Sequence, residues 1–254
     1  MNAYFKLTWM QFKLFSREPV ALFFTLAFPL MVLLLFGMIF GNAADPQYGP
    51  QYGPQYGGGY GYIDALVPGL AAIIIGTVAL MSIPVATATA REQKILRRYK
   101  ATPMPPLVYL VADITTNVFI ALIGLVILLI AAPLVFDLRF GGNWVYVFGG
   151  FLLSAFSFAA VGYIVAGLSP TGRIAAVVGQ VLYFPMMFLS GVGFPPEIMP
   201  AGVRAVANWL PLTHVVNLLQ NLWFGQGWSG QSVLILGLML VLGTVVSVYT
   251  FRWE

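Results

Sequence analysis

Six long apolar stretches occupy most of this 254-residue chain and constrain its fold more than any other feature. A helix that crosses a bilayer needs about 20 apolar residues, and each stretch is long enough. The runs lack the two-residue alternation of barrel strands and are about twice as long as such strands. The sequence therefore predicts an all-α membrane protein with six transmembrane helices, at about residues 20–41, 63–89, 107–134, 145–168, 174–194 and 230–251.

The composition agrees with a membrane protein and excludes several other classes. Hydrophobic residues make up 60% of the chain, charged residues only 8%, and the mean hydropathy is +0.89. Soluble domains carry about 25% charged residues, so these few charges cannot coat a water-soluble particle. A soluble enzyme, a secreted module and a disordered tail are excluded. The sequence has no cysteine and one histidine, so we expect neither disulfides nor a metal site.

The N-terminal segment, residues 1–19, predicts an amphipathic interfacial helix. On a helical wheel Lys6, Lys13 and Arg17 fall within an arc of about 40°, and aromatic side chains lie on the far side. A basic amphipathic helix of this kind lies in the plane of the lipid headgroups. The alternative is the ordinary start of a long first span.

The basic residues are distributed unevenly between the two sides of the predicted bundle. Ten Lys and Arg residues fall on one side, in the N-terminal segment, the loop after the second span, the loop after the fourth and the C-terminal tail. Only Arg139 and Arg204 fall on the other. The positive-inside rule then places both termini in the cytoplasm. We expect a multi-pass protein of a cytoplasmic membrane of the prokaryotic type.

Two segments on the predicted outer side differ from the spans. Residues 42–62 contain three Pro-Gln-Tyr-Gly repeats, a composition that predicts a flexible extracytoplasmic tether. Residues 195–228 are too polar to span and too apolar for a solvated loop, so we expect short re-entrant helices between the fifth and sixth spans. No segment is long enough for a separate soluble domain, and residues 1–254 are treated as one transmembrane domain.

The loop at residues 90–106 holds the only sizeable charged block in the sequence. Ile95, Leu96 and Tyr99 recur at helical spacing among its cations, and prolines from Pro103 onwards end any helix before the third span. A short amphipathic helix suits docking into a groove on another protein. The same cations could instead anchor to anionic headgroups. The charge pattern alone leaves both possibilities open.

The block resembles the cytoplasmic loop of permeases of the ABC type 2 exporter family, in which an acidic–basic pair precedes a basic run ending in Ala-Thr-Pro. Other marks of the family follow in order along the whole chain. The branch of daunorubicin-type drug, antibiotic and lipid exporters is the most similar, although Lys94-Ile95 stands where that branch commonly has Gly-Thr. The marks are the basic N-terminal helix, Phe28-Pro29-Leu30, Val67-Pro68-Gly69, Phe188-Leu189-Ser190-Gly191, Phe194-Pro195-Pro196, Leu210-Pro211-Leu212-Thr213-His214 and Phe224-Gly225.

The resemblance implies the permease subunit of an ATP-driven exporter that moves a hydrophobic drug, antibiotic, lipid or glycan-type substrate outward. No Gly-Lys dipeptide is present, so the chain lacks a phosphate-binding loop of the Walker kind. ATP and Mg²⁺ would bind a separate ATPase, and this chain would be no enzyme and would need no cofactor. The expected partners are two ATPase subunits, a second permease copy or paralogue and the bilayer, without nucleic acid. The residues expected to couple to the ATPase are Arg91, Glu92, Lys94, Leu96, Arg97, Arg98, Tyr99, Lys100, Thr102 and Pro103.

Polar residues within the spans are candidates for the translocation path, because they are costly in lipid. Asp113 and Asn117 share one face of the third span, and Gln180 lies in the fifth. Asp113 has an alternative role as a hydrogen-bonded residue near the interface. The aromatic candidates on the fifth span are Tyr183, Phe184 and Phe188.

Two functions of other classes remain as alternatives. An intramembrane serine hydrolase could pair Ser190 with His214. However, Ser190 lacks the G-x-S-G context of rhomboid-like proteases, and no oxyanion donor is evident. A passive channel would conduct without nucleotide.

Overall fold

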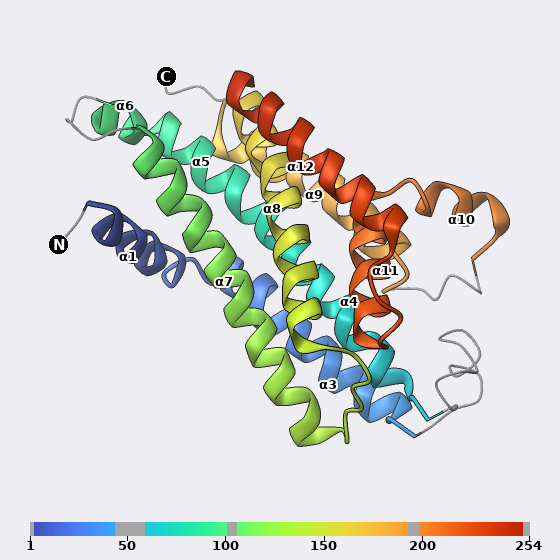
Figure 1. Cartoon of the computed structure of the whole chain (residues 1–254). Helices are drawn as coiled ribbons and strands as arrows, with labels where there is room; N and C mark the ends of the chain where they lie inside the picture. The colour runs from blue at the N-terminus through green and yellow to red at the C-terminus, as the bar shows by residue number, and fades with distance from the viewer. Residues whose placement is uncertain (1–2, 44–58, 101–105, 193–198, 251–254) are drawn as a thin grey trace.

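The computed structural model describes residues 3–43, 59–100, 106–192 and 199–250, and within these ranges the chain is helical without strands (Figure 1). The helices, with the π-helical turns η1 and η3, are α1 (Ala3–Phe15), α2 (Pro19–Leu22), η1 (Phe23–Ala27), α3 (Phe28–Phe40), α4 (Tyr62–Thr77), η3 (Val78–Ser82), α5 (Ile83–Glu92), α6 (Ile95–Lys100), α7 (Pro106–Val135), α8 (Trp144–Leu168), α9 (Gly172–Leu189), α10 (Ala201–Ala207), α11 (Pro211–Trp223) and α12 (Gly230–Thr250).

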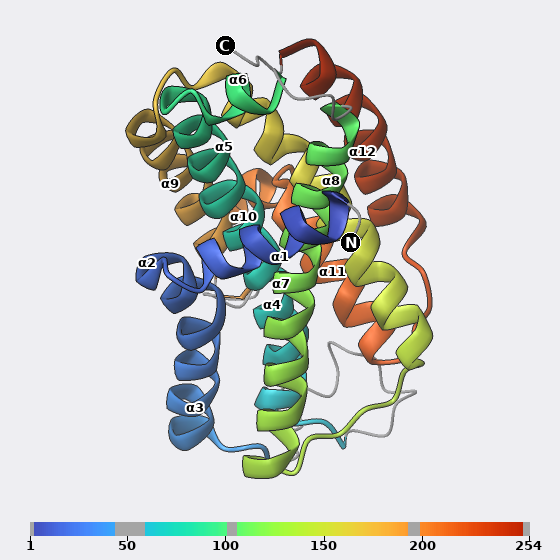
Figure 2. The same ribbon diagram turned by 90° about the vertical axis from the view of Figure 1, so that its left-hand side faces the viewer.

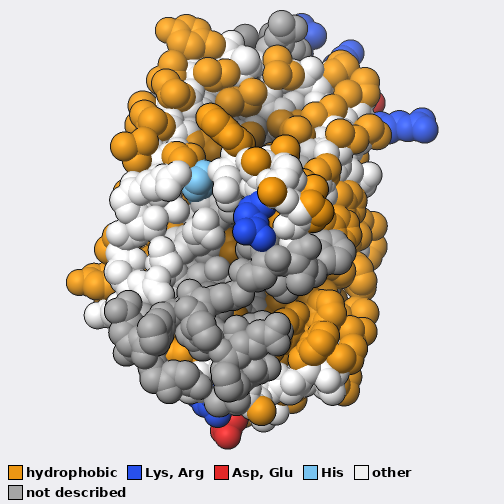
Figure 3. Space-filling model, turned by 90° about the vertical axis from the view of Figure 1, so that its right-hand side faces the viewer, with side chains coloured by type: hydrophobic (Ala, Val, Ile, Leu, Met, Phe, Trp, Pro, Cys, Tyr) orange, Lys and Arg blue, Asp and Glu red, His pale blue; other side chains and the backbone are white. Residues whose placement is uncertain are grey.

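Six helical segments are long and apolar enough to cross a membrane, which confirms the predicted fold class. Each coincides with one of the six apolar stretches of the sequence. They are Pro19–Phe40, Tyr62–Glu92, Val108–Val135, Trp144–Leu168, Gly172–Leu189 and Gly230–Thr250. Hydrophobic side chains also prevail on the described part of the face shown in Figure 3, where charged side chains are few.

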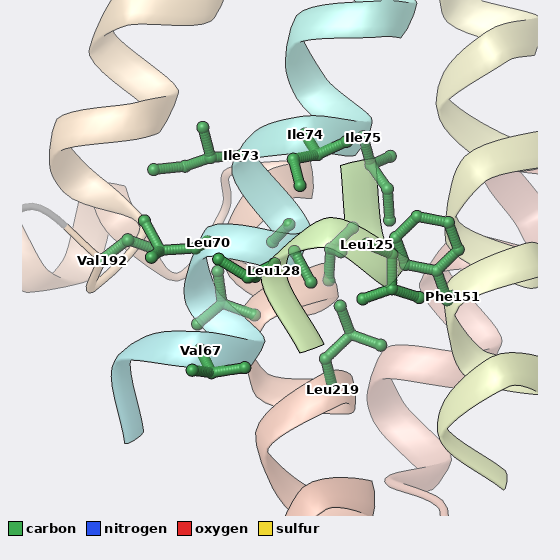
Figure 4. Packing of buried hydrophobic residues seen from close by; sticks show 14 of the residues in the cluster. Val67, Leu70, Ile73, Ile74, Ile75, Leu125, Leu128, Phe151, Val192 and Leu219 are labelled. Atoms are coloured by element: carbon green, nitrogen blue, oxygen red, sulfur yellow. The ribbon is translucent and has the colours of Figure 1, made fainter. Parts of the chain in front are cut away.

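The second span forms the centre of the bundle. Nearly every residue of α4 is buried, and the helix packs against α3, α7, α8 and α11. Figure 4 shows Leu70 and Ile75 of α4 among side chains from the neighbouring helices, including Leu125 of α7, Phe151 of α8 and Leu219 of α11. Burial on all sides explains why this span shows no polar face in the sequence.

Each π-helical turn comes just before a proline. Pro29 follows η1 and Pro84 follows η3. A proline has no N–H and its ring clashes with the carbonyl four residues earlier, so the helix widens locally to accommodate it. The two prolines therefore reshape their spans without interrupting them, as membrane helices allow.

A glycine of α9 packs closely against a backbone carbonyl of the widened η3 turn. That carbonyl belongs to Leu80, and a Cβ atom added at Gly179 would lie only 2.0 Å from its oxygen. A larger residue than glycine would force the two helices apart. The widened turn of the second span is consequently in backbone contact with the fifth.

The bundle has two distinct ends. At one end lie α6, the last turn of α8, the first turn of α9 and the last turn of α12, and α1 crosses α7 in the same half (Figures 1 and 2). At the other end the Asp64 carboxylate, fully buried, joins the α3–α4 connection to the α7–α8 connection. It accepts hydrogen bonds from the backbone N–H of Gly61 at 2.7 Å, the backbone N–H of Arg139 at 2.8 Å and the Asn42 amide at 3.0 Å.

The N-terminal segment forms a helix, α1, that packs on α7. The Tyr4 hydroxyl donates to the Thr115 hydroxyl at 3.1 Å, and the Thr116 hydroxyl donates to Gln11 Oε1 at 3.0 Å. The cations that the sequence places on one arc are all exposed, as an interfacial helix requires: Lys6, Lys13 and Arg17. Its position relative to the headgroups stays a prediction.

The segment between the fifth and sixth spans contains the short helices α10 and α11. Both are too short to cross a bilayer. One side of α11 is buried against α4, α8 and α12, so this helix is part of the bundle. The Pro-Gln-Tyr-Gly repeats lie outside the described residues.

Candidate functional site

The charged block begins at the end of α5 and continues into α6. Lys94 makes the turn between the two helices with a φ of 59°, in the left-handed region. Glycine adopts this conformation without strain, whereas an L-residue does so at a cost of about 1–2 kcal/mol. A glycine would therefore suit this turn, and Lys94 adopts the conformation in its place.

The side chains of α6 divide into exposed and buried ones. Arg97 and Arg98 are exposed, as is Lys94 before them. Leu96, in contrast, is 0% exposed within the chain itself. The coupling role expected for Leu96 stays a prediction, but its side chain is already buried by its own chain before any partner binds. The side chains of Tyr99 and Lys100, and all of Thr102 and Pro103, lie outside what the structure describes.

The acidic–basic pair at the start of the block bonds to backbone groups of the chain's own helices, although Arg91 is only half-buried and Glu92 is exposed. One guanidinium nitrogen of Arg91, Nη2, donates to the carbonyls of Ala166, at 3.1 Å, and Ser169. Glu92 Oε2 accepts a hydrogen bond from the backbone N–H of Gly172 at 3.0 Å. Sequence reasoning places both residues in the block but misses these contacts, because their partners are backbone groups that carry no signature in the sequence.

The predicted path residues on α9 differ in exposure. Gln180 and Phe188 are exposed, and Phe184 is half-buried. Tyr183 is fully buried, and its hydroxyl lies 2.8 Å from the hydroxyl of Thr77 in α4. Tyr183 thus joins two helices and does not line a surface, whereas Gln180 is a polar side chain on an exposed face of a span.

Asp113 is also an internal residue. It is buried between α7 and α8, where the Tyr163 hydroxyl donates a hydrogen bond to Asp113 Oδ2. The Asn117 amide donates to the Asp113 carbonyl at 2.9 Å, within α7. The structure therefore agrees with the alternative role of Asp113 as a hydrogen-bonded residue. Its side chain does not reach an exposed surface that could line a path.

The serine and histidine of the hydrolase alternative each have another partner. The Ser190 hydroxyl donates to the Met187 carbonyl at 3.1 Å, at the end of its own helix. His214 bonds to the backbone of Asn208, and its burial lowers the pKa of the imidazole below the usual 6.5. No hydrogen bond joins Ser190 to His214 in the described part of the chain, so the arrangement does not favour nucleophilic catalysis. Nor do the described residues include a cluster of side chains suited to a metal ion.

Comparisons with known proteins agree with this architecture. A putative transport permease YvfS of Bacillus subtilis is 24% identical over 68% of this chain and 71% of its own length. Nodulation protein J of Rhizobium leguminosarum bv. viciae is 31% identical over 29% of each chain. A probable multidrug ABC transporter permease YbhS of Escherichia coli is 20% identical over 74% of this chain and half of its own. Residues 2–224 match the family described as ABC-2 type transporter. With six membrane-spanning helices and a match over nearly its whole length, the chain belongs to the ABC-2 transporter family and is a membrane subunit of an ABC transporter.

Proposed function

We propose that this chain is the permease subunit of an ATP-driven exporter whose ATP is hydrolysed by a separate ABC ATPase bound at α6. The observation that carries the proposal is the exposed pair Arg97 and Arg98 on a short helix at one end of an ABC-2 bundle. A surface helix with exposed cations presents charge to a protein partner, while Leu96 fixes its position from below. The sequence itself contains no Walker-type loop.

In the proposed orientation, the α6 end and both termini lie on the cytoplasmic side of a cytoplasmic membrane. Exposed cations at the α6 end include Lys94, Arg97, Arg98 and Arg173, while Arg139 lies at the opposite end. The positive-inside rule supports this orientation.

The working unit contains two permease copies, or this chain and a paralogue, together with two ATPases. Gln180 supports this arrangement, because a polar side chain on an exposed face of a span is unfavourable against lipid. The second copy covers this face or lines a path with it. Exposed apolar neighbours such as Phe188 suit a hydrophobic substrate, and one relative is named a multidrug permease. The substrate class is a hydrophobic drug, antibiotic, lipid or glycan.

The test is co-purification of this chain with the ABC ATPases of its own genome, expressed with it one at a time. We expect a stable complex that hydrolyses ATP in phospholipid vesicles, whereas the purified chain alone hydrolyses none. An ATPase variant with its Walker lysine replaced is the control for activity. Hydrolysis by this chain alone, or an ATPase that never associates with it, would refute the proposal.

A further inference from the structure

Two adjacent residues of opposite charge, Arg91 and Glu92, reach from the end of α5 to the turn between α8 and α9. The Arg91 guanidinium contacts the carbonyls of Ala166 and Ser169 at the end of α8. The Glu92 carboxylate contacts the N–H of Gly172, the first residue of α9. One residue therefore caps the C-terminal end of one span, and its neighbour caps the N-terminal end of the next.

The signs of the two charges match the helix ends that they contact. The last carbonyls of a helix lack intrahelical donors and carry partial negative charge, which favours a cation. The first N–H groups of a helix lack acceptors and carry partial positive charge, which favours an anion. Hydrogen bonds with one charged partner are also about twice as strong as neutral ones. The pair is thus placed to hold the end of α5 firmly to this turn.

The backbones of α5 and α9 approach closely at the same place. A Cβ atom added at Gly172 would lie 2.1 Å from the Thr89 hydroxyl oxygen and 3.3 Å from the Thr89 Cβ. Gly179, two helical turns further along α9, makes the comparable approach to the Leu80 carbonyl. The second and fifth spans are therefore in contact along the half of α9 that begins at Gly172. Arg91 and Glu92 lie at the end of that contact.

The next residues of the block have a different environment. After the turn at Lys94, Arg97 and Arg98 of α6 are exposed. The exposed arginines are available to a partner, whereas Arg91 and Glu92 are engaged with the chain's own helix ends. The block that reads as one unit in the sequence thus contains one part that bonds to the chain's own helix ends, with Glu92 itself exposed, and a second exposed part on α6.

We propose that Arg91 and Glu92 are positioning residues that make the end of α5 and the α8–α9 turn one rigid unit, so that a movement imposed on α6 reaches α9. This inference rests on the proposed function, because it presumes an ATPase that moves α6. The exposed face of α9 that carries Gln180 then moves with the coupling segment. If Arg91 and Glu92 are replaced, the ATPase still binds, but the movement that it imposes on α6 reaches only α5 and not α9.

The test uses the complete complex in phospholipid vesicles and a single-cysteine reporter, Val181→Cys, on the exposed face of α9. The chain has no other cysteine. The measured quantity is the ratio of maleimide labelling rates with and without ATP plus vanadate. In Glu92→Ala the departure of that ratio from one should be about tenfold smaller than in the parent. Tenfold is the factor expected for the loss of one charge-assisted hydrogen bond. Glu92→Gln keeps an acceptor oxygen and should fall between Glu92→Ala and the parent.

The matched control is Arg173→Gln, which removes an exposed charge from the same turn. It should leave the ratio unchanged. ATPase co-purification is measured on every variant, and it should stay at the parental level in Glu92→Ala. Loss of the ATPase in step with the response would make Glu92 a docking residue and overturn the proposal, as would an unchanged response with the ATPase bound. A parental chain that never binds an ATPase would refute the proposed function instead.

A disulfide between α5 and α9 can replace the link that Glu92 makes. Such a cross-link distinguishes a loss of positioning from misfolding. The distance from the Thr89 Cβ to a Cβ at Gly172, 3.3 Å, is near the separation of about 3.5–4.5 Å in disulfides. The Thr89→Cys, Gly172→Cys pair in the Glu92→Ala background should therefore cross-link on oxidation. The readout is ATP hydrolysis stimulated by the permease, with the cysteines of the ATPase replaced beforehand. Oxidation should restore the stimulation and reduction should remove it; a cross-linked complex that stays unstimulated would contradict the inference.

Discussion

The hydroxyl of Tyr163 on α8 donates its hydrogen bond to the carboxylate of Asp113 on α7, in the interior of the bundle. Both side chains are buried, at 5% and 7% exposure. The bond satisfies a polar group that the apolar surroundings would otherwise leave without a partner.

Tyr163→Phe should destabilise the protein by about 1–3 kcal/mol, because the Asp113 carboxylate loses its buried donor. Asp113→Asn keeps an acceptor oxygen and should cost less. Thermal unfolding in detergent measures both, and the double variant Tyr163→Phe, Asp113→Asn tests their coupling. If the double variant costs as much as the sum of the single ones, the two groups do not interact.

The orientation can be tested with single cysteines on the cysteine-free background. Ala43→Cys, exposed at the Asp64 end of the bundle, should react with an impermeant maleimide in intact cells. Gln93→Cys, exposed between α5 and α6, should react only after the membrane is opened. Labelling of Gln93→Cys in intact cells would reverse the proposed orientation.

The two kinds of side chain on α6 should respond differently to substitution. Arg97→Gln with Arg98→Gln removes exposed charge, so we expect normal folding and a loss of ATPase co-purification. Leu96→Ala removes a buried side chain and should cost about 2–4 kcal/mol of stability. Thermal unfolding and co-purification, measured side by side, distinguish them. Normal stability of Leu96→Ala would show that its burial contributes little.

Close helix contact makes one glycine sensitive to a single methyl group. Gly179→Ala would place its methyl group 2.0 Å from the Leu80 carbonyl oxygen and should cost about 1–3 kcal/mol. Gly237→Ala on α12 is the matched control, because no atom lies within 4 Å of the new methyl group. Alanine there should be neutral or stabilise by about 0.5–1 kcal/mol. Equal unfolding temperatures of the two variants would contradict the close contact.

Burial of His214 makes stability depend on pH. Its pKa in the folded protein is lowered from 6.5 by burial, opposed in part by the hydrogen bond to Asn208. As the pH falls through about 6.5, the unfolded chain binds the proton first, so this contribution is complete above that pH and declines below it. Unfolding temperatures from about pH 8 to about pH 5 should fall less steeply in His214→Gln. An identical slope would exclude His214 as the source.

The spans could be predicted from the sequence because lipid imposes a length and a composition on any helix that crosses it. The details of contact could not. The prolines Pro29 and Pro84 are visible in the sequence, yet the fit of Gly179 against the Leu80 carbonyl depends on a helix far along the chain. Helical periodicity shows that Leu96 lies on an apolar face, but not whether its own chain or a partner buries it.

The candidate site shows the same limit for charged residues. The sequence groups Arg91 and Glu92 with Arg97 and Arg98 because all four belong to one run of charge. Their environments differ because the first two bond to backbone carbonyls and N–H groups, and every residue type except proline carries both of those groups. Likewise, Tyr163 gives no sign in the sequence that it will meet Asp113.

The hydrogen bonds around Asp64 have a consequence for protein engineering. Asn42 Oδ1 accepts from the backbone N–H of Ile63 at 3.1 Å, so the first and second spans are tied together at the two points where the 44–58 segment leaves and returns. Because that tie does not pass through the segment, its length and composition are free to vary while the spans keep their places. An affinity tag or an epitope in place of the Pro-Gln-Tyr-Gly repeats should therefore leave the two spans in position and provide a handle for purification.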